Sequence, residues 1–500
     1  MSRTPKKQAT TLKRALVVAG IALAAVAGAV LVPEAPDSPT PPGSSRDADP
    51  TPDDRERRVG LVARLQESIT LEGVMQHLQT FQAIADDHDG NRFTATQGHE
   101  ASVDYVSEVL TEAGYEVSFD ELDVTVYEQD TPSVLRTTAP SRTTFERSAD
   151  FTTFNFSPSG DVTGAIAPVG VERNGLGAPD GCEEDAFAGF PTGNVALVQA
   201  GPCPLTQQVL SAQEAGASAV LLMFTPELAD TSSGVLRPTL ASSNGKVPAL
   251  AVSNKLGRAL ARPGTRVRVE VDGSVVERRT RNVIAERPNG PADVVMVGAH
   301  LDSVQDGPGI NDNGSGSAAI LELAVAMADV ETSEGVRFAF WTAEELGLLG
   351  SEHYVDELND SQRVRITAYL NFDMVASPNY LRLVYGDNLG NIDNPAAIKN
   401  LFLDYFERRD LATDVIDLSG RSDHGPFERA GIPVGGLFTG AEMIKSDEAE
   451  GLFGGEADAP ADPCYHLACD DLANLSRQSL NQLTDAIAYA VATLATSDDI

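Results

Sequence analysis

The stretch Val294–Ser317 constrains the fold of this chain more than any other. It reads VVMVGAHLDSVQDGPGINDNGSGS, and its four leading apolar residues are typical of a fully buried parallel strand. His300 and Asp302 follow where such a strand would end, and a loop rich in Gly, Asn and Asp then carries Asp312. Because ligands bind at the carboxyl edge of open α/β sheets, the stretch predicts an α/β fold and the first part of a metal site.

Later segments add further candidate ligands. Two apolar runs, 336–341 and 368–374, also indicate buried strands that end in acidic residues. Together with a histidine near the carboxyl terminus they give five candidate ligand positions: His300, Asp312, the pair Glu344-Glu345, Asp373 and His466. Imidazole combined with carboxylate suits zinc. Five ligands are too many for one catalytic zinc, whereas two metals that share a bridging carboxylate would use all five.

Composition sets the broad class of the protein. A chain of 500 residues is longer than one ordinary domain, so we expect two domains and tails. Hydrophobic residues make up 42% of the chain, which is enough for large cores. The formal net charge of −36 argues against nucleic acid as a partner, because phosphates would be repelled, and favours a solubilising acidic surface.

The amino terminus resembles an export signal. Basic residues precede an uncharged apolar run, 15–32, in which 25–27 reads Ala-Val-Ala and offers a small-residue cleavage site. The same run is long enough for a marginal single membrane span. We therefore expect a secreted protein, or one anchored in the membrane and facing outside if 1–32 stays uncleaved. Residues 33–58 are rich in Pro, Asp, Ser and Thr and predict a disordered linker.

The middle of the chain differs in character from its flanks. From about residue 140 to 275, short β-like runs alternate with Gly and Pro, and 205–217 indicates a helix that ends at Gly216. Before this segment, 71–85 and the residues up to Gly114 show helical spacing, and 115–119 begins a strand. Cys182 and Cys203 lie in the middle segment, and in an exported chain we expect them to pair. Closing that loop contributes roughly 3 kcal/mol in the chain-entropy model.

Two family resemblances rest on these motifs. The segments 294–317, 338–351, 369–374, 419–442 and 464–470 together resemble the secreted co-catalytic di-zinc aminopeptidases of bacterial leucine-aminopeptidase type. The run 194–222 resembles the protease-associated domain, a small β-rich module inserted in several exopeptidases. The resemblances imply a mixed, largely parallel sheet flanked by helices, with a peptidase domain in two parts, 59–139 and 276–500, and an inserted protease-associated domain over 140–275.

The resemblance also implies a role for each candidate ligand. It implies that His300 and Asp373 hold one zinc ion, that Glu345 and His466 hold the other, and that Asp312 bridges both. The implied cofactor is therefore Zn²⁺, two ions per chain.

Further roles follow from the same resemblance. Glu344 matches the general base, Asp302 matches a carboxylate that orients the imidazole of His300, and Tyr465 matches a tyrosine that steadies the tetrahedral intermediate. Cys464 and Cys469 match a short disulfide that fixes the loop presenting His466. The segment 419–442 resembles the family segment that lines the substrate pocket. Arg421 and Phe438 are the candidate substrate contacts in this segment.

The sequence therefore predicts a secreted zinc metallo-aminopeptidase that removes large apolar residues such as Leu from peptides with a free amino terminus. Two alternatives stay open: a di-zinc carboxypeptidase or other amidohydrolase of the same fold, and a non-catalytic peptide-binding surface protein. We expect a monomer that contacts a membrane only through an uncleaved amino-terminal segment. The remaining histidines are expected at the surface or in loops: His77, His88, His99, His353 and His424. His424 is the exception to note, because its segment also resembles the family segment that lines the substrate pocket.

Other catalytic classes are not supported. The glycines around Asp312 are not followed by Gly-Lys-Ser/Thr, so they do not predict a phosphate-binding P-loop. A G-x-S-x-G elbow between a strand and a helix, with matching triad partners, is also missing from the sequence.

Overall fold

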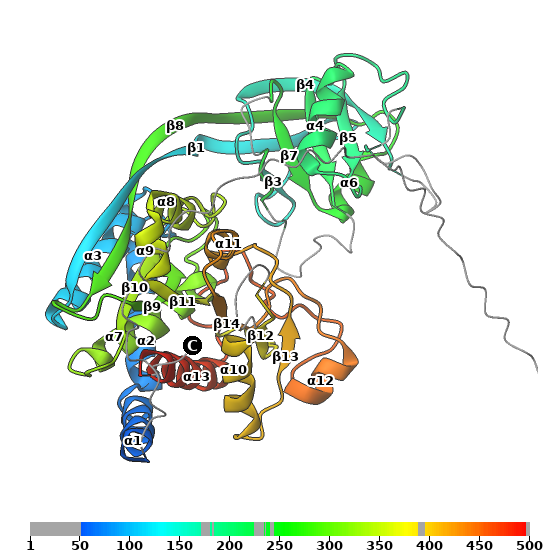
Figure 1. Ribbon diagram of the computed structural model, residues 1–500. Coiled ribbons are helices and arrows are strands. Elements are labelled where there is room, and N and C mark those ends of the chain that lie inside the picture. The colour runs from blue at the N-terminus through cyan, green and yellow to red at the C-terminus, as the bar shows by residue number, and fades with distance from the viewer. Residues whose placement is uncertain are drawn as a thin grey trace, which may run out of the picture. The chain divides into compact units, whose positions relative to one another are not determined.

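The computed structural model describes residues 52–171, 181–182, 185–224, 235, 237–240, 245–388 and 396–496 (Figure 1). The predicted export signal and most of the predicted linker lie outside the described residues. Helix α1 begins at Pro52, so the end of the predicted linker has helical backbone; the sequence Pro-Asp-Asp suits a first helical turn. Among the helices of the described part, none is both long and apolar enough to span a membrane.

A mixed sheet forms the centre of the peptidase part, as the sequence predicts. Its four central strands are parallel, and in spatial order they are β14 (Val434–Phe438), β11 (Ile366–Phe372), β9 (Val294–His300) and β10 (Gly335–Trp341). Antiparallel strands flank them, β8 (Arg266–Glu286) beside β10 and β12 (Leu383–Tyr385) beside β14, and β13 (Asp414–Ile416) pairs parallel with β12. The predicted strands over 336–341 and 368–374 correspond to β10 and β11.

Both faces of this sheet are buried. Along β9, Val295 and Val297 point into one core and Val294 and Met296 into the other, the alternation expected of a strand. The larger core is covered by α1 (Pro52–Ser68), α2 (Leu71–Asp87), α3 (Gln97–Glu112), α7 (Gly316–Met327), α10 (Ala397–Glu407) and α13 (Arg477–Ala495). The smaller core is covered by α8 (Leu349–Glu357) and α11 (His424–Arg429). Two short helices, α9 (Asp360–Val364) and α12 (Asp447–Phe453), complete this part.

The middle segment is an α/β unit of its own. Its strands are β3 (Phe151–Thr153), β4 (Gly160–Val169), β5 (Val195–Gln199), β6 (Ala219–Met223) and β7 (Ala249–Val252). Strands β4 to β7 are parallel and β3 is antiparallel at the edge. Helices α4 (Leu205–Glu214) and α6 (Asn254–Leu260) pack against them, and Cys182 and Cys203 form a disulfide as expected.

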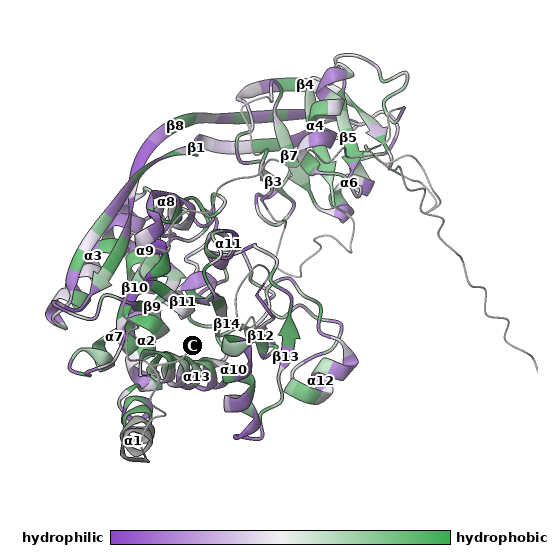
Figure 2. Cartoon of the chain, in the orientation of Figure 1, coloured by the Kyte–Doolittle hydropathy of each residue, from purple (hydrophilic) through white to green (hydrophobic). Residues whose placement is uncertain are grey.

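Two long strands were not predicted. Strand β1 (Glu116–Ala139) pairs antiparallel with β8 over most of its length (Figure 1). The short β2 (Thr143–Thr144) pairs with β1 near its end. Only 115–119 and one of the short β-like runs before residue 275 read as strands in the sequence, because the rest of β1 and β8 is rich in charged residues, as Figure 2 shows for the curved part of β8. These charges pair across the strands; Arg279, for example, lies 3.1 Å from Asp123.

Candidate metal centre

The central strands place their last residues at one edge of the sheet. In the parallel register His300 at the end of β9 pairs with Trp341 at the end of β10, and Asp373 directly follows β11, the other neighbour of β9. Glu344 and Glu345 lie in the turn between β10 and α8. Strand order therefore brings together three segments that are up to 73 residues apart along the chain, from His300 to Asp373.

The loop after β9 returns Asp312 to this edge. It leads into a tight turn, Ile310–Ser315, just before α7, in which Asp312 and Asn313 have non-helical backbone angles. Gly309 has a φ of 61°, and a Cβ at this position would lie 2.3 Å from the carbonyl oxygen of Asp312, so glycine is required here. The side chain of Asp312 is consequently buried against the ends of the strands.

The five candidate ligands form two groups that share Asp312. His300 Nε2 lies 3.2 Å from Asp312 Oδ1 and 3.3 Å from Asp373 Oδ1. His466 Nε2 lies 3.1 Å from the other Asp312 oxygen, Oδ2, and 3.1 Å from Glu345 Oε2. Each carboxylate oxygen of Asp312 thus faces a different imidazole. Both groups have donor atoms close enough to hold a metal ion.

The chemistry of this donor set fits zinc. His300 Nε2, Asp373 Oδ1 and Glu345 Oε1 are buried and have no hydrogen-bond partner in the described part of the chain. Burial works to lower the pKa of His300 and of His466, but the surrounding carboxylates outweigh it and hold both pKa values well above the usual range. The cluster therefore demands positive charge at this place, which protons on the imidazoles or a divalent cation can supply.

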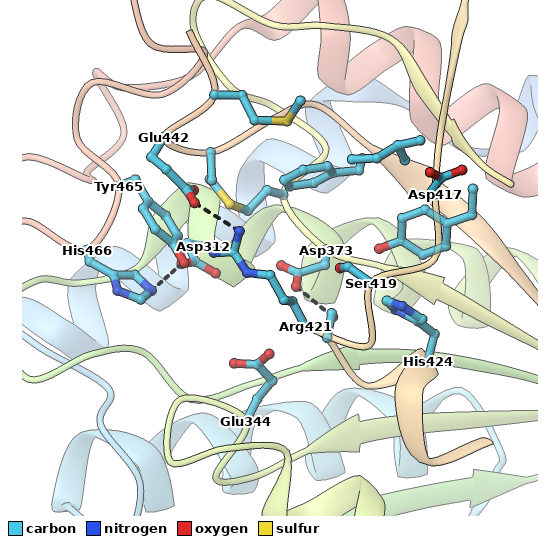
Figure 3. A pocket seen from close by; sticks show the side chains of 17 residues that line it. Asp312, Glu344, Asp373, Asp417, Ser419, Arg421, His424, Glu442, Tyr465 and His466 are labelled. Atoms are coloured by element: carbon cyan, nitrogen blue, oxygen red, sulfur yellow. Dashed lines mark hydrogen bonds and ion pairs between the residues drawn. The ribbon is translucent and has the colours of Figure 1, made fainter. Parts of the chain in front are cut away.

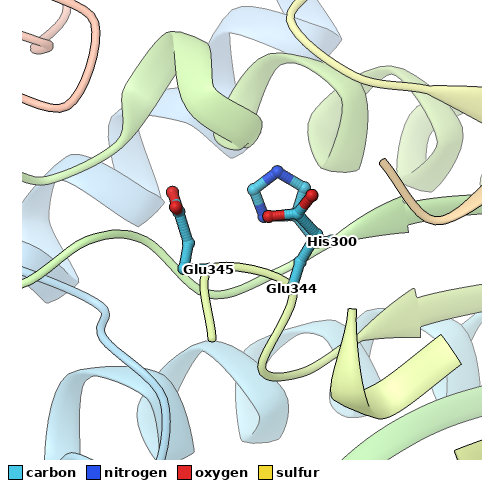
Figure 4. A group of neighbouring side chains, drawn as sticks. All are labelled: His300, Glu344 and Glu345. Carbon is cyan, nitrogen blue, oxygen red and sulfur yellow. The ribbon is translucent and has the colours of Figure 1, made fainter. Parts of the chain in front are cut away.

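Glu344 lies beside the cluster without belonging to the two shared groups. Figure 4 shows it with His300 and Glu345, and their nearest donor atoms lie within 4.8 Å of one another. Burial raises the pKa of Glu344 well above its usual value, and repulsion from Glu345 adds to this, while His300 opposes it. A carboxylate with a raised pKa is a stronger base than an exposed one.

The carboxylate of Asp302 lies close to the imidazole of His300 that it is predicted to orient, but the shorter contact comes from the backbone of Asp302. His300 Nδ1 hydrogen-bonds to the backbone carbonyl of Asp302 at 3.1 Å, and the carboxylate of Asp302 lies farther away, at 3.6 Å. The carboxylate also accepts the hydroxyl of Thr94 at 2.7 Å and the backbone amides of the turn after β10. Asp302 therefore ties the end of β9 to the turn that carries Glu344 and Glu345.

Tyr465 and His466 lie in a loop closed by the disulfide between Cys464 and Cys469, as expected. The two rings stack with centroids 3.8 Å apart. Burial raises the pKa of Tyr465 well above its usual value, so its hydroxyl keeps its proton and can donate a hydrogen bond.

A pocket opens beside the cluster (Figure 3). Both predicted substrate contacts line it: Phe438 at the end of β14, and Arg421, whose guanidinium donates to Glu442 at 2.9 Å. Its apolar wall also includes residues that the sequence did not single out: Met374, Tyr385, Ile416, Ala441 and Met443. These residues come from four separate segments of the chain. In the sequence, only the segment 419–442, through its resemblance to the family, indicated a pocket.

Several histidines are placed differently from the prediction. His99 is fully buried and bonds to Thr342 at 2.8 Å, His77 is buried and bonds to Tyr105 at 2.6 Å, and His424 is buried and lines the pocket. The expectation of surface or loop positions is wrong for His77 and His99, whereas the position of His424 in the pocket lining agrees with the resemblance of its segment. Helix faces packed on the sheet bury them, and a single sequence gives little sign of that.

Comparisons with known proteins place this geometry in a family. A model described as "Peptidase family M28" matches residues 282–491, and one described as "PA domain" matches residues 162–260. An aminopeptidase of Pseudomonas aeruginosa is 41% identical, with 88% of this chain and 83% of that protein covered. A probable lipoprotein aminopeptidase of Mycobacterium tuberculosis is 37% identical, covering 85% of each. A probable leucine aminopeptidase 2 of Aspergillus fumigatus is 40% identical over 82% of this chain and 80% of its own.

Solved structures show the same fold. An aminopeptidase from Aneurinibacillus sp. strain AM-1 matches with a TM-score of 0.66 and 25% identity, covering 87% of this chain and 96% of that one. A zinc aminopeptidase from Bacillus subtilis matches with a TM-score of 0.66 and 23% identity, covering 86% and 97%.

Fold and site together define a metallo-exopeptidase. The chain belongs to peptidase family M28 and carries a PA domain as an insert. The predicted family and fold class are thereby confirmed.

Proposed function

We propose that this protein is a secreted aminopeptidase that uses two zinc ions and releases large apolar residues from the amino terminus of peptides. The observation that carries the proposal is the position of Asp312, whose two oxygens face His300 and His466 separately. A carboxylate shared in this way is what a pair of metal ions needs as a bridge. The relatives described as aminopeptidases support the same activity.

The zinc ligands in this proposal are the two shared groups, His300 with Asp373 and His466 with Glu345, joined by Asp312. Zinc supplies Lewis acidity, which lowers the pKa of a nearby water molecule and polarises a carbonyl oxygen. Residues other than these ligands transfer the protons and donate the hydrogen bonds that the reaction needs.

Glu344 is the proposed general base. It lines the pocket and lies next to the ligand groups, so it can take the proton from the attacking water. Its raised pKa lets it keep that proton until the peptide bond breaks and then pass it to the leaving amine. The protonated Tyr465, which also lines the pocket, donates a hydrogen bond to the oxygen that gains charge during the attack.

The pocket supports a preference for large apolar side chains. Met374, Phe438 and Met443 contribute apolar surface next to Glu344, where the first side chain of a peptide would lie. Similarity to leucine aminopeptidases points in the same direction. Arg421, on the polar side of the pocket, is the proposed contact for the peptide backbone.

Location and organisation are part of the proposal. Two disulfides and the relative described as a lipoprotein support a location outside the cytoplasm. We propose a monomer in which 59–139 and 276–500 form the peptidase domain and 140–275 the insert. Strand β8 runs across the boundary at residue 275, so the two parts share one continuous strand.

The test is hydrolysis of a leucyl chromogenic substrate by purified protein. Glu344→Gln should lower kcat by at least about a hundredfold with zinc still bound, since general base catalysis contributes about 10²–10⁴-fold. Glu352→Gln changes a half-exposed glutamate on α8 that pairs with Arg429; it is the matched control and should keep wild-type activity. Removing metal with a chelator should abolish activity, and added zinc should restore it.

Substrates separate the alternatives. An aminopeptidase needs a free amine, so blocking the amino terminus of a peptide should stop cleavage, and a peptide blocked only at its carboxyl terminus should still be cut. Full activity of Glu344→Gln, or cleavage of the amino-blocked peptide, would refute the proposal.

A further inference from the structure

Two buried carboxylates, Asp462 and Asp470, bracket the loop that carries Tyr465 and His466. Each is 1% exposed, although neither belongs to the ligand groups found among the described residues. A buried carboxylate is costly unless hydrogen-bond donors surround it, so its partners indicate what it does.

The partners of Asp470 are successive residues of the turn that carries Asp312. Its Oδ1 accepts the backbone N–H of Asn311 at 2.9 Å, and its Oδ2 accepts the backbone N–H of Asp312 itself at 3.0 Å. Its backbone carbonyl accepts the N–H of Ile310 at 3.0 Å. One residue thereby fixes three consecutive amides of the turn Ile310–Ser315.

The carboxylate of Asp462 holds the same turn through the side chain of Asn311. Its Oδ2 accepts the amide of Asn311 at 2.6 Å, and its Oδ1 accepts the backbone N–H of Cys464 at 2.8 Å. Asn474 connects the two carboxylates, because its Nδ2 donates to Asp462 Oδ1 at 2.9 Å and to Asp470 Oδ1 at 3.2 Å. The turn with Asp312 and the loop with His466 are thus joined by one buried network.

We infer that Asp470, supported by Asp462 and Asn474, is the positioning residue that places Asp312 between the two imidazoles. The inference rests on the proposed function, in which Asp312 is the shared zinc ligand. Asp312 can face both histidines only if its backbone is fixed relative to the loop of His466, and Asp470 makes that connection directly. Hydrogen bonds to a buried carboxylate are strong and directional, which suits this task.

The deciding variant is Asp470→Asn. It keeps the size of the side chain, but an NH₂ group replaces one oxygen and cannot accept a backbone N–H. Asp471→Asn is the matched control, because Asp471 is the next residue and its carboxylate accepts only the local N–H of Ala473, at 2.7 Å, among the hydrogen bonds found for it. Zinc affinity is measured by competition with a chromophoric chelator, zinc content by elemental analysis, and folding by the melting temperature of the metal-free protein.

We expect Asp470→Asn to bind at least one zinc about 10–100-fold more weakly than wild type, the usual effect of removing a group that orients a ligand. Its kcat should fall with little change in KM, and Asp471→Asn should match the wild type. Wild-type zinc affinity in Asp470→Asn overturns the inference even if the metal-free variant melts earlier, and so does an equal loss in Asp471→Asn.

Should Asp470→Asn fail to fold, Asn474→Ser decides. It removes the amide that joins the two carboxylates, and we expect a smaller but measurable loss of zinc affinity; an unchanged affinity overturns the inference. The two proposals fail in different ways. A wild-type protein that binds no zinc refutes both, whereas normal zinc binding in the wild type and in Asp470→Asn refutes the positioning role alone.

Discussion

One carboxylate oxygen of Asp302 accepts the backbone N–H of Glu344 at 3.3 Å. The other oxygen accepts the backbone N–H of Glu345 at 3.4 Å and the hydroxyl of Thr94 at 2.7 Å. Asp302 is fully buried, so these contacts are not shared with bulk water. Asp302, two residues after the end of β9, therefore fixes the position of the turn after β10, and with it the positions of the proposed base and of one proposed ligand.

The variant Asp302→Ala should uncouple this turn from the sheet edge. We expect kcat to fall about 10–100-fold, because Glu344 and Glu345 lose the acceptor that orients their backbone. Thr94→Val removes one of the donors and leaves the carboxylate in place, so its effect should be clearly smaller. Steady-state kinetics on zinc-loaded protein measures both. Equal losses in the two variants would show that Asp302 has no special role.

The sequence predicts the strands of the site well and for a physical reason. Strands β9, β10 and β11 are buried on both faces, so each appears as an apolar run, and the polar residues that end it stand out. All five candidate ligands were found in this way or from the family resemblance, and the structure brings them together.

The residues that hydrogen-bond to the candidate ligands and their turns could not be predicted from the sequence, and this also has a physical reason. Asp470 contacts Asn311 from 159 positions away, and Ser422 contacts Asp373 from 49 positions away. Aspartate and serine are common surface residues, and only the tertiary fold shows that these are buried. Strands β1 and β8 were missed because cross-strand ion pairs, rather than a core, accompany much of their length.

Ser422 orients the proposed ligand Asp373. Its hydroxyl donates to Asp373 Oδ2 at 2.7 Å and accepts the amide of Asn371 at 2.9 Å, leaving Oδ1 toward His300. Ser422→Ala removes a hydrogen bond to a charged group, typically about 1.5–3 kcal/mol, so we expect a loss of roughly tenfold or more in kcat or in zinc affinity. Ser479→Ala removes another buried hydroxyl, which donates to the backbone carbonyl of Val375 and not to a ligand side chain, and should affect mainly stability. Unchanged kinetics and zinc binding in Ser422→Ala would contradict the assigned role.

His99 predicts how stability depends on pH. Burial lowers the pKa of His99 from 6.5 to about 4, although the charge of Asp302 opposes this. Between pH 4 and pH 6.5 His99 binds a proton in the unfolded chain but not in the folded chain. The free energy of unfolding therefore falls as the pH drops from 6.5 to 4. The contribution is about 3 kcal/mol over that window.

The variant His99→Gln should flatten this dependence. Glutamine can still bond to Thr342 but does not titrate, so the variant should lose less stability than the wild type between pH 6.5 and 4. Chemical unfolding at several pH values, with chelator present in every sample, measures the difference. Parallel curves for the two proteins would show that His99 is not kept neutral by the fold.

The apolar wall of the pocket should decide the choice between leucyl and alanyl substrates. Phe438 lines the pocket, and Phe438→Ala removes surface that a leucine side chain would contact. Because contacts of about one methylene are worth roughly 1–3 kcal/mol in such pockets, the preference for Leu over Ala in kcat/KM should fall about tenfold or more. Ile444→Ala is the control, since Ile444 is 63% exposed and does not line the pocket. If both variants keep the wild-type ratio of leucyl to alanyl kcat/KM, this wall does not select the substrate.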